Sequence, residues 1–523
     1  MQESCASPAS TSSAVRSHVA TVRSRTKPGS AALAQLDLGV SLARSGNYDE
    51  AAAAFRRALD VDPLSLAARF NLGLTFAARG QLDAAIEVFR DALRIAPDLA
   101  QLHFSLGAAL KRQGRLEEAI LSYDRAAALQ PSLATFNDLG SALRERGRTD
   151  EAMAAFRRAL QIDPSAALVH LNLGTALEDK QQLEDAIRSY ERALALDPEL
   201  MPAHRSLAMV LVERDLVDQG FARFRHYARA KSSTRGLKAK RESAPALKTR
   251  HDHDQADYLM SASGNNRQVR GLFDVTSVES ASQTSGFRIA DGGPLGEPVL
   301  NAGKNAAGIE ANWTSADPKV VVIDDLLTLP ALEGLRRFCW GSTIWNSIYS
   351  GGYLGAFPED GFAPTLLAQA SEELRARFPA IFGRLPLKLW WAFKCDSGAP
   401  GIGIHADFAA VNVNFWVTPD EANLDTESGG LRIWSVPAPR GWNYQKYNAN
   451  PDLIREFLSR ADARSVIVPY RANRAVIFDS NLFHETHQPR FKDGYLNRRI
   501  NITLLYGMRE NAHEGGTSPQ ANP

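Results

Sequence analysis

The apolar residues of the first 200 positions follow a helical spacing that is itself repeated. The stretch 36–63, LDLGVSLARSGNYDEAAAAFRRALDVDP, returns with the same arrangement at 70–97, and again near 104–131, 137–164 and 171–198. Each copy has two apolar stripes separated by a short polar turn, which is typical of two amphipathic helices. This part of the chain is therefore predicted to be an array of five helical hairpins.

Four positions in each copy have a fixed residue character. A glycine lies in the first helix, a small residue follows twelve positions later, an aromatic residue comes four after that, and a proline ends the copy. Small residues let the two helices cross closely, the aromatic ring fills the core beside them, and the proline stops the second helix. Because no copy can bury its apolar face alone, the copies are expected to stack into a superhelix. The glycines are Gly39, Gly73, Gly107, Gly140 and Gly174, and the aromatic residues are Phe55, Phe89, Tyr123, Phe156 and Tyr190.

This pattern resembles the tetratricopeptide repeat family over roughly residues 32–200. A sixth, divergent copy covers 201–230, where Ala208 replaces the glycine and Gly220 replaces the small residue. We expect it to cap the array, so that the all-α tetratricopeptide-repeat solenoid spans 32–230.

The position two before each glycine is small and polar in every copy. In the family this position lies on the concave face, and in some relatives an asparagine ladder there holds a peptide backbone. Two interpretations stay open. The face binds an extended protein or peptide partner, with Asn71 and Asn172 as candidate groove residues, or these are only solvent-compatible helix positions. The six residues are Asp37, Asn71, Ser105, Asp138, Asn172 and Ser206.

The helical period fades after the repeats, and residues 231–318 are expected to form a mostly irregular linker. Residues 229–250 contain eight Lys or Arg and one Glu. A basic run of this kind can bind nucleic acid. Without interleaved aromatic residues, and with a formal charge of +1 for the chain, a solvated linker is favoured and no nucleic-acid partner is expected.

The second half of the chain has the composition of strands. A strand and a capped helix are predicted at 317–340 and another helix at 364–382. Helices followed by many short strands predict an α+β domain built on a two-sheet jelly roll over 319–511, while 1–31 and 512–523 are expected to be disordered tails. The predicted strands are 385–398, 401–417, 429–438, 463–471, 473–480 and 498–507.

Composition narrows the class of protein. The 523 residues exceed one ordinary core, and 44% hydrophobic with 23% charged residues is normal for a soluble globular protein. Three well-separated cysteines give no disulfide framework, and no apolar run reaches membrane-spanning length. We expect a cytoplasmic protein without a membrane partner. The Ser- and Arg-rich N-terminus keeps a transit peptide open as an alternative.

The candidate chemistry lies in the predicted strands. In GIGIHADFAAVNVNFWV (401–417), His405 and Asp407 are two apart, so in an extended strand they point to the same side. His484 follows a later apolar strand. In the last strand Arg499, Asn501 and Thr503 alternate with apolar residues. Two histidines and one carboxylate on one side of a metal form the facial triad typical of non-haem Fe(II) oxygenases.

The segments HAD, FDSNLFHET and RRINIT resemble the Fe(II)/2-oxoglutarate-dependent dioxygenases, in their prolyl-hydroxylase-like branch, over roughly 319–510. The resemblance implies a double-stranded β-helix with His405, Asp407 and His484 as Fe(II) ligands. It also implies that 2-oxoglutarate is a cosubstrate held by Arg499, that Asn501 and Thr503 assist, and that ascorbate is an optional reductant. An intact Asp407 implies hydroxylation and not halogenation.

Several features leave alternatives within this resemblance. His487 is a rival third ligand and Arg498 is a rival basic residue. The distance from His484 to Arg499 is longer than in many members of the family. Cys395 stands near the place where some relatives have a tyrosine that contacts the cosubstrate.

Three functional interpretations follow. The first is a hydroxylase whose repeats recruit a protein substrate, with a small-molecule substrate left open. The second is a repeat scaffold for protein interaction with an inactive barrel. The third is a cupin-like metal enzyme of another class. Formation of succinate from 2-oxoglutarate distinguishes the first from the other two.

Overall fold

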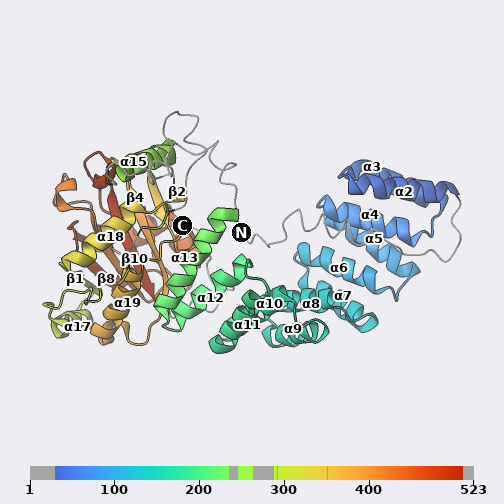
Figure 1. The fold of residues 1–523 in the computed structure, drawn as a ribbon, viewed down its shortest axis with the longest axis horizontal. Helices are drawn as coiled ribbons and strands as arrows, with labels where there is room; N and C mark the ends of the chain where they lie inside the picture. The colour runs from blue at the N-terminus through green and yellow to red at the C-terminus, as the bar shows by residue number, and fades with distance from the viewer. Residues whose placement is uncertain (1–29, 235–245, 263–287, 291–292, 350, 510–523) are drawn as a thin grey trace. The chain divides into compact units, whose positions relative to one another are not determined.

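The computed structural model describes residues 30–234, 246–262, 288–290, 293–349 and 351–509. The chain divides between Leu200 and Met201 into two compact units. The first unit is helical, and the second combines helices with two antiparallel sheets (Figure 1). Among the described residues no helix is both long and apolar enough to cross a membrane.

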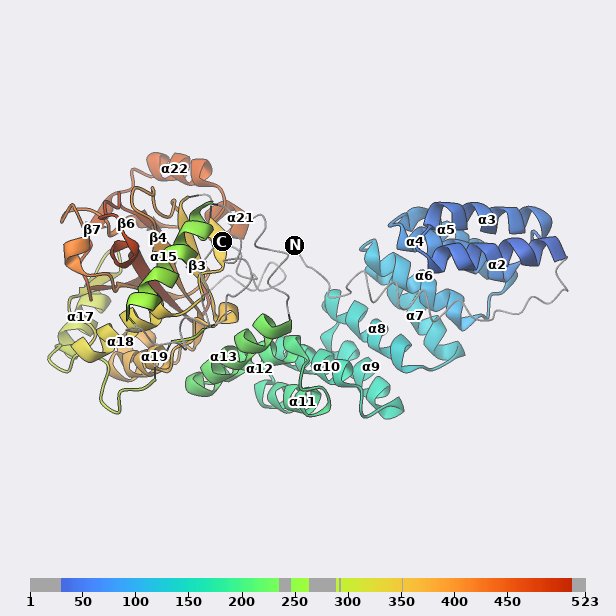
Figure 2. The same ribbon diagram turned by 45° about the horizontal axis from the view of Figure 1, so that its top comes forward.

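The first unit is a row of helical hairpins that follow one another in chain order (Figure 2). Each predicted copy forms one hairpin, with its glycine in the first helix and its aromatic residue in the second. The hairpins are α2 (Ser30–Arg44) with α3 (Tyr48–Val61), α4 (Leu66–Ala78) with α5 (Leu82–Ile95), α6 (Ala100–Arg112) with α7 (Leu116–Leu129), α8 (Leu133–Glu145) with α9 (Thr149–Ile162), and α10 (Ala167–Asp179) with α11 (Leu183–Leu196).

The repeated glycines allow the two helices of each hairpin to approach. A Cβ atom on Gly140 would lie 2.6 Å from the ring of Phe156, and the other four glycines have the same relation to their aromatic partners. The rings are fully buried, as are the small residues beside them. The repeated spacing of glycine and aromatic residue therefore corresponds to one packing contact that occurs in all five hairpins. Because glycine has no side chain, the aromatic ring can lie against the first helix.

Two further helices open the second unit. α12 (Met201–Glu213) and α13 (Val217–Thr234) form a hairpin whose apolar residues join the core of this unit. Phe221 stacks on Trp390 with ring centroids 4.3 Å apart, and Phe224 meets the same ring edge-on. The sequence pattern assigns 201–230 to the array as a cap, whereas these aromatic side chains have their buried partners in the second unit.

The segment expected to be a linker also contains helices, α15 (Ala246–Ala262) and α17 (Ala306–Ser315). α15 is held to the second unit by polar side chains. Gln255 donates to the carbonyl oxygens of Trp340 and Ser342 at 3.0 and 2.8 Å, and Asp254 pairs with Arg498 at 2.6 Å. Residues 246–262 thus depart from the mostly irregular linker expected over 231–318, because they form a helix whose buried groups have partners in the second unit.

The larger sheet has seven strands in the order β1-β8-β5-β10-β4-β3-β2, and all its pairs are antiparallel. One face packs on α18 (Leu329–Gly341) and α19 (Thr365–Arg377) through Ile500, Ile502 and Leu504 of the central strand. The strands are β1 (Val320–Ile323), β2 (Ser347–Tyr349), β3 (Tyr353–Ala356), β4 (Leu387–Cys395), β5 (Val411–Trp416), β8 (Ala475–Asp479) and β10 (Arg499–Tyr506).

The smaller sheet has the order β7-β6-β9, from β6 (Leu431–Pro437), β7 (Ser465–Val468) and β9 (Leu482–Thr486). Between β6 and β7 the chain inserts two helices, α21 (Tyr444–Tyr447) and α22 (Pro451–Arg460). In chain order β4 and β5 belong to the larger sheet and β6 and β7 to the smaller one, after which β8, β9 and β10 alternate between the larger and the smaller sheet. This alternation brings the opposite face of the larger sheet, which carries Arg499, Asn501 and Thr503, toward the smaller one.

Candidate metal centre

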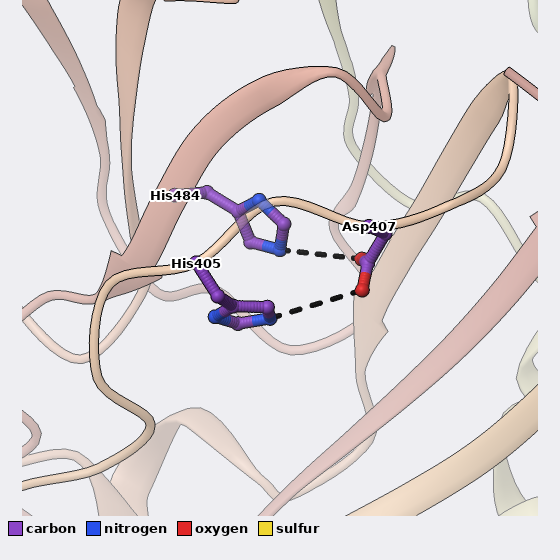
Figure 3. Close-up of side chains that lie close together, drawn as sticks. All are labelled: His405, Asp407 and His484. Atoms are coloured by element: carbon purple, nitrogen blue, oxygen red, sulfur yellow. Dashed lines mark ion pairs between the residues drawn. The ribbon is translucent and has the colours of Figure 1, made fainter. Parts of the chain in front are cut away.

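His405, Asp407 and His484 come together at the edge of the smaller sheet (Figure 3). His405 and His484 form an isolated antiparallel bridge, with their backbone N–O distances at 3.0 and 2.8 Å. The Asp407 amide donates to the carbonyl oxygen of Ser480 at 3.1 Å. The strand predicted over 401–417 begins only at Val411. His405 and Asp407 lie before it, so they are held by single backbone contacts and not by the hydrogen-bond ladder of a strand. His484 lies inside β9, a strand that the sequence pattern does not predict.

The three side chains offer one ligand atom each, and these atoms all lie within 4.8 Å of one another. Nε2 of His484 is 3.5 Å from Oδ2 of Asp407, and Nε2 of His405 is 4.0 Å from its Oδ1. Within the described residues this is the one cluster of three or more His, Cys, Asp or Glu that could hold a metal. The donor set matches the two-histidine, one-carboxylate arrangement that suits Fe(II).

Backbone carbonyl groups orient both imidazoles. Nδ1 of His405 lies 2.8 Å from the oxygen of Gly403, and Nδ1 of His484 lies 3.1 Å from that of Leu482. A carbonyl can only accept, so each Nδ1 carries the proton and each Nε2 presents a lone pair toward Asp407. This arrangement of the outer nitrogen is typical of metal-binding histidines.

Burial makes the charges of this cluster unfavourable without a cation. It raises the pKa of Asp407, against the opposing effects of His405 and of a hydrogen bond from Asn412. It also lowers the pKa of His484 well below its usual value, with a further contribution from His405. A divalent cation among these groups would compensate the buried carboxylate charge and favour the neutral imidazole.

A row of amide side chains connects the triad to the centre of the larger sheet. Asn412 donates to Oδ2 of Asp407 at 2.6 Å, and Asn414 donates to Oδ1 of Asn412 at 2.5 Å. Asn501 and Thr503 in turn donate to Oδ1 of Asn414 at 2.7 and 2.9 Å. Thr503 and Asn501 therefore share a face with Arg499, as the sequence pattern predicts, and belong to one network with Asp407.

Arg499 is 1% exposed, and its guanidinium is only partly satisfied. Nε donates to the carbonyl oxygen of Gly429 at 2.6 Å, whereas both terminal nitrogens are buried and have no oxygen or nitrogen acceptor among the described residues, with the weakly accepting Cys395 thiol beside the guanidinium. The Cys395 side chain, opposite it on β4, and the Tyr470 phenol lie close enough to influence its pKa, which burial lowers. A buried arginine with two free nitrogens is the environment that an anionic ligand group would complete.

The triad lines a cavity between the two sheets. Trp391 and Phe393 of β4, with their β10 partners Thr503 and Asn501, form the wall on the larger sheet. The Trp391 Nε1 and the Asn501 Oδ1 are buried and have no partner. Arg499 is not among the lining residues, but it precedes Asn501 by two positions on the same face of β10.

The rival candidates lie elsewhere. His487 is outside the cluster, and its backbone amide donates to Gly430. Arg498 points away from Arg499 and pairs with Asp254 and Asp396 at 2.6 and 3.0 Å. Neither residue lines the cavity.

Three residues of the site are not identified by the sequence analysis. Asn412 and Asn414 form the link to Asp407, and Tyr470 lies beside Arg499 and packs on Trp416. The asparagines leave a readable signal, because VNVN puts two amides on one face of an otherwise apolar strand. Tyr470 leaves none, because it follows β7 in a loop.

The candidate groove residues of the repeats are engaged within the array. Asn71 donates to the carbonyl of Ala67 at 2.8 Å, and Asn172 donates to Oδ1 of Asn137 at 2.8 Å. The two asparagines therefore do not form one ladder with a common geometry. Their role in binding a peptide stays a prediction.

Comparisons with known proteins identify the first unit. Residues 36–100, 100–133 and 167–200 match tetratricopeptide repeat profiles, and residues 140–181 match a TPR repeat profile. No curated protein matches the chain.

Three solved structures are among those similar to the chain. A crystal structure of MamA is 25% identical, with 31% of this chain and 95% of that chain covered and a TM-score of 0.30. YrrB, described as a TPR protein with an unusual peptide-binding site, is 24% identical over 33% of this chain and 89% of that chain, with a TM-score of 0.30. PilF of Pseudomonas aeruginosa is 22% identical over 38% and 89%, with a TM-score of 0.34.

Proposed function

We propose that this chain, whose residues 36–200 are tetratricopeptide repeats, is an Fe(II)- and 2-oxoglutarate-dependent oxygenase that hydroxylates a protein or peptide substrate. The observation that carries the proposal is the pairing of a buried His405, Asp407 and His484 cluster with an incompletely satisfied Arg499 on an adjoining strand face. The buried metal-ligand cluster and the buried arginine are both unfavourable when nothing is bound beside them. Fe(II) would stabilise the first, and the distal carboxylate of 2-oxoglutarate would stabilise the second.

The sheet topology supports a double-stranded β-helix. β4, β5, β8 and β10 adjoin one another in the larger sheet, in the order β8-β5-β10-β4. The smaller sheet has the order β7-β6-β9 and gains His405 through its bridge to β9. With the His405 segment counted in the smaller sheet, successive segments alternate between the two sheets except at β6 and β7, and this connectivity supports a jelly roll.

The residues present fit the metal and the cosubstrate. His405, Asp407 and His484 would hold Fe(II) through two imidazole nitrogens and one carboxylate oxygen. With Fe(II) bound, the site would gain the O₂ chemistry that couples oxidative decarboxylation of 2-oxoglutarate to hydroxylation. In the neutral imidazoles the Gly403 and Leu482 carbonyls favour the proton on Nδ1, which leaves each Nε2 as the ligand atom.

The chain's other residues would bind and orient the cosubstrate. Arg499 would pair with the distal carboxylate through its two free nitrogens, a charge-assisted contact made in the absence of water. Asn501 offers an unpaired Oδ1 on the same face. Trp391 and Phe393 exclude water from the cavity wall.

The repeats supply the argument for a macromolecular substrate. Stacked helical hairpins form extended surfaces that bind protein segments, and five of them precede the β-rich unit in one chain. A small-molecule substrate would leave this surface without a catalytic role.

The first experiment measures succinate formed from 2-oxoglutarate by purified protein with Fe(II), ascorbate and O₂. We expect slow turnover without substrate that disappears in Asp407→Ala and in Arg499→Ala. An Arg498→Lys variant is the matched control, because the neighbouring arginine pairs outside the cavity. Succinate formation that survives Asp407→Ala would contradict the proposal.

A second candidate is a repeat scaffold with a catalytically inactive β-rich unit. All the family matches lie within the repeats, so they support the protein-binding part of this candidate. Protein that retains Fe(II) and binds a partner through the array, but forms no succinate in the presence of that partner, would support the scaffold.

A further inference from the structure

The helical insertion between β6 and β7 lies behind the segments that carry the three candidate ligands. Its apolar residues form a cluster with Ile404 and Ala406, which flank His405, and with Phe483, which precedes His484. Neighbouring residues in an extended segment point to opposite sides, so this packing supports the face away from the cavity. The insertion contributes Tyr447, Ile454 and Leu458 as its buried members.

The insertion also holds the peptide between the first two ligands. The amide of Ala406 donates to the carbonyl oxygen of Tyr447 at 2.9 Å, and Nδ2 of Asn448 donates to the carbonyl oxygen of Ala406 at 3.1 Å. Both polar groups of the one residue between His405 and Asp407 are thus bound by two consecutive residues at the end of α21. Ala406 is fully buried, so water cannot replace these contacts.

Tyr447 is itself fixed in position. The guanidinium carbon of Arg509 lies 4.7 Å from the centre of its ring, and Arg509 donates to the carbonyl oxygen of Ala438 at 3.1 Å. The Arg509 amide donates to the carbonyl of Phe408, the residue after Asp407. The end of the insertion and the ligand segment are therefore tied to one buried arginine.

We propose that Asn448 is a positioning residue that sets the distance between the His405 and Asp407 ligand atoms; this inference rests on the proposed metal-dependent function. Residues 401–410 have no strand ladder, so their conformation depends on isolated contacts. The insertion supplies two of these contacts at the position where a change in the backbone would separate the ligands. Outer contacts of this kind commonly change metal affinity by about 10–100-fold when removed.

The test is a Co(II) titration of the full chain, followed by visible absorption, with Asn448→Ala against wild type. We expect the dissociation constant to rise by about 10–100-fold and the absorption bands to shift, while the thermal midpoint changes little. Asn448→Asp keeps the size of the side chain but cannot donate from that position, so it should weaken Co(II) binding at least as much.

Asn450→Ala is the matched control. Asn450 belongs to the same insertion and its side chain accepts from the Leu453 amide at 3.1 Å, without contact to the ligand segment. It should lower stability and leave Co(II) affinity unchanged. Equal affinities in wild type, Asn448→Ala and Asn448→Asp would overturn the positioning role while leaving the metal site intact. No Co(II) binding by wild type, or binding that survives Asp407→Ala, would overturn the proposed function and this inference with it.

Discussion

Arg499 has incomplete polar surroundings in the protein alone. Among the described residues its two buried terminal nitrogens have no acceptor stronger than the Cys395 thiol, and Cys395 and Tyr470 are uncharged at neutral pH because burial raises both of their pKa values. A buried charge without an ionic partner destabilises the folded state, whereas an apolar side chain of similar length in the same place does not.

Replacing Arg499 by methionine should therefore separate stability from function. We expect the free energy of unfolding of the metal-free protein to stay the same or to rise by about 1 kcal/mol, while succinate formation is lost. Urea unfolding of both proteins, without Fe(II) or 2-oxoglutarate, measures the first effect. A loss of several kcal/mol would show that the arginine is a structural residue and not a ligand group.

For single residues, the sequence predicts the direction of a side chain better than the groups that it contacts. His405 and Asp407 are recognisable because a spacing of two puts them on one side, and the alternation of Arg499, Asn501 and Thr503 predicts their common face. The contacts of Asn448 and Tyr470 are not predictable, since each depends on a loop whose path is set by distant residues.

Among the elements, α15 lies within 231–318, which the sequence predicts to be mostly irregular. The apolar residues of α15 have only a weak helical period. It packs on the rest of the unit through polar side chains, and a polar sequence of this kind predicts a solvent-exposed segment. His251 is fully buried and lies 3.2 Å from the Lys394 amino group, which is also buried and is covered by the rings of Trp345 and Tyr495. A hydrophobic pattern cannot reveal a helix whose contacts are made by histidine, glutamine and aspartate.

This environment predicts a dependence of stability on pH. Burial, with Lys394 beside it, lowers the pKa of His251 to about 3, so the imidazole is neutral when folded and takes up a proton near pH 6.5 when unfolded. The folded state therefore loses stability as pH falls below about 6.5 and continues to lose it down to about pH 3.

We expect His251→Gln to reduce the loss of unfolding free energy between pH 7 and pH 5.5 by about 1 kcal/mol. Urea unfolding at the two pH values measures it. His253→Gln is the control, because that imidazole lies on the same helix and its side chain is 60% exposed. Equal losses in wild type and His251→Gln would mean that this histidine does not govern the acid response.

For the whole molecule, the division between the units does not coincide with the end of the helical pattern. Residues 201–230 keep the helical period of the repeats, and only the replacements at Ala208 and Gly220 distinguish them from the five preceding copies. The period shows which face of a helix is apolar but not which element covers it. Phe221 and Phe224 are covered by Trp390, a residue more than 160 positions further along the chain.

A fragment comprising 201–523 should consequently fold, whereas 231–523 should not reach a fixed tertiary structure. Loss of α12 and α13 uncovers the Trp390 ring and removes two buried phenylalanines, each contributing about 2–3 kcal/mol. Near-ultraviolet circular dichroism reports the packing of the tryptophans. Cooperative unfolding of 231–523 with the stability of 201–523 would contradict the assignment.

The position of this division has a consequence for how the gene can change. Duplication or loss of 34 codons, the usual spacing between successive repeat glycines, lengthens or shortens the array without changing a residue of the second unit. Recombination that exchanges the array for another keeps the second unit whole only when its breakpoint lies before Met201. The hairpin that resembles a last repeat would then be inherited with the second unit.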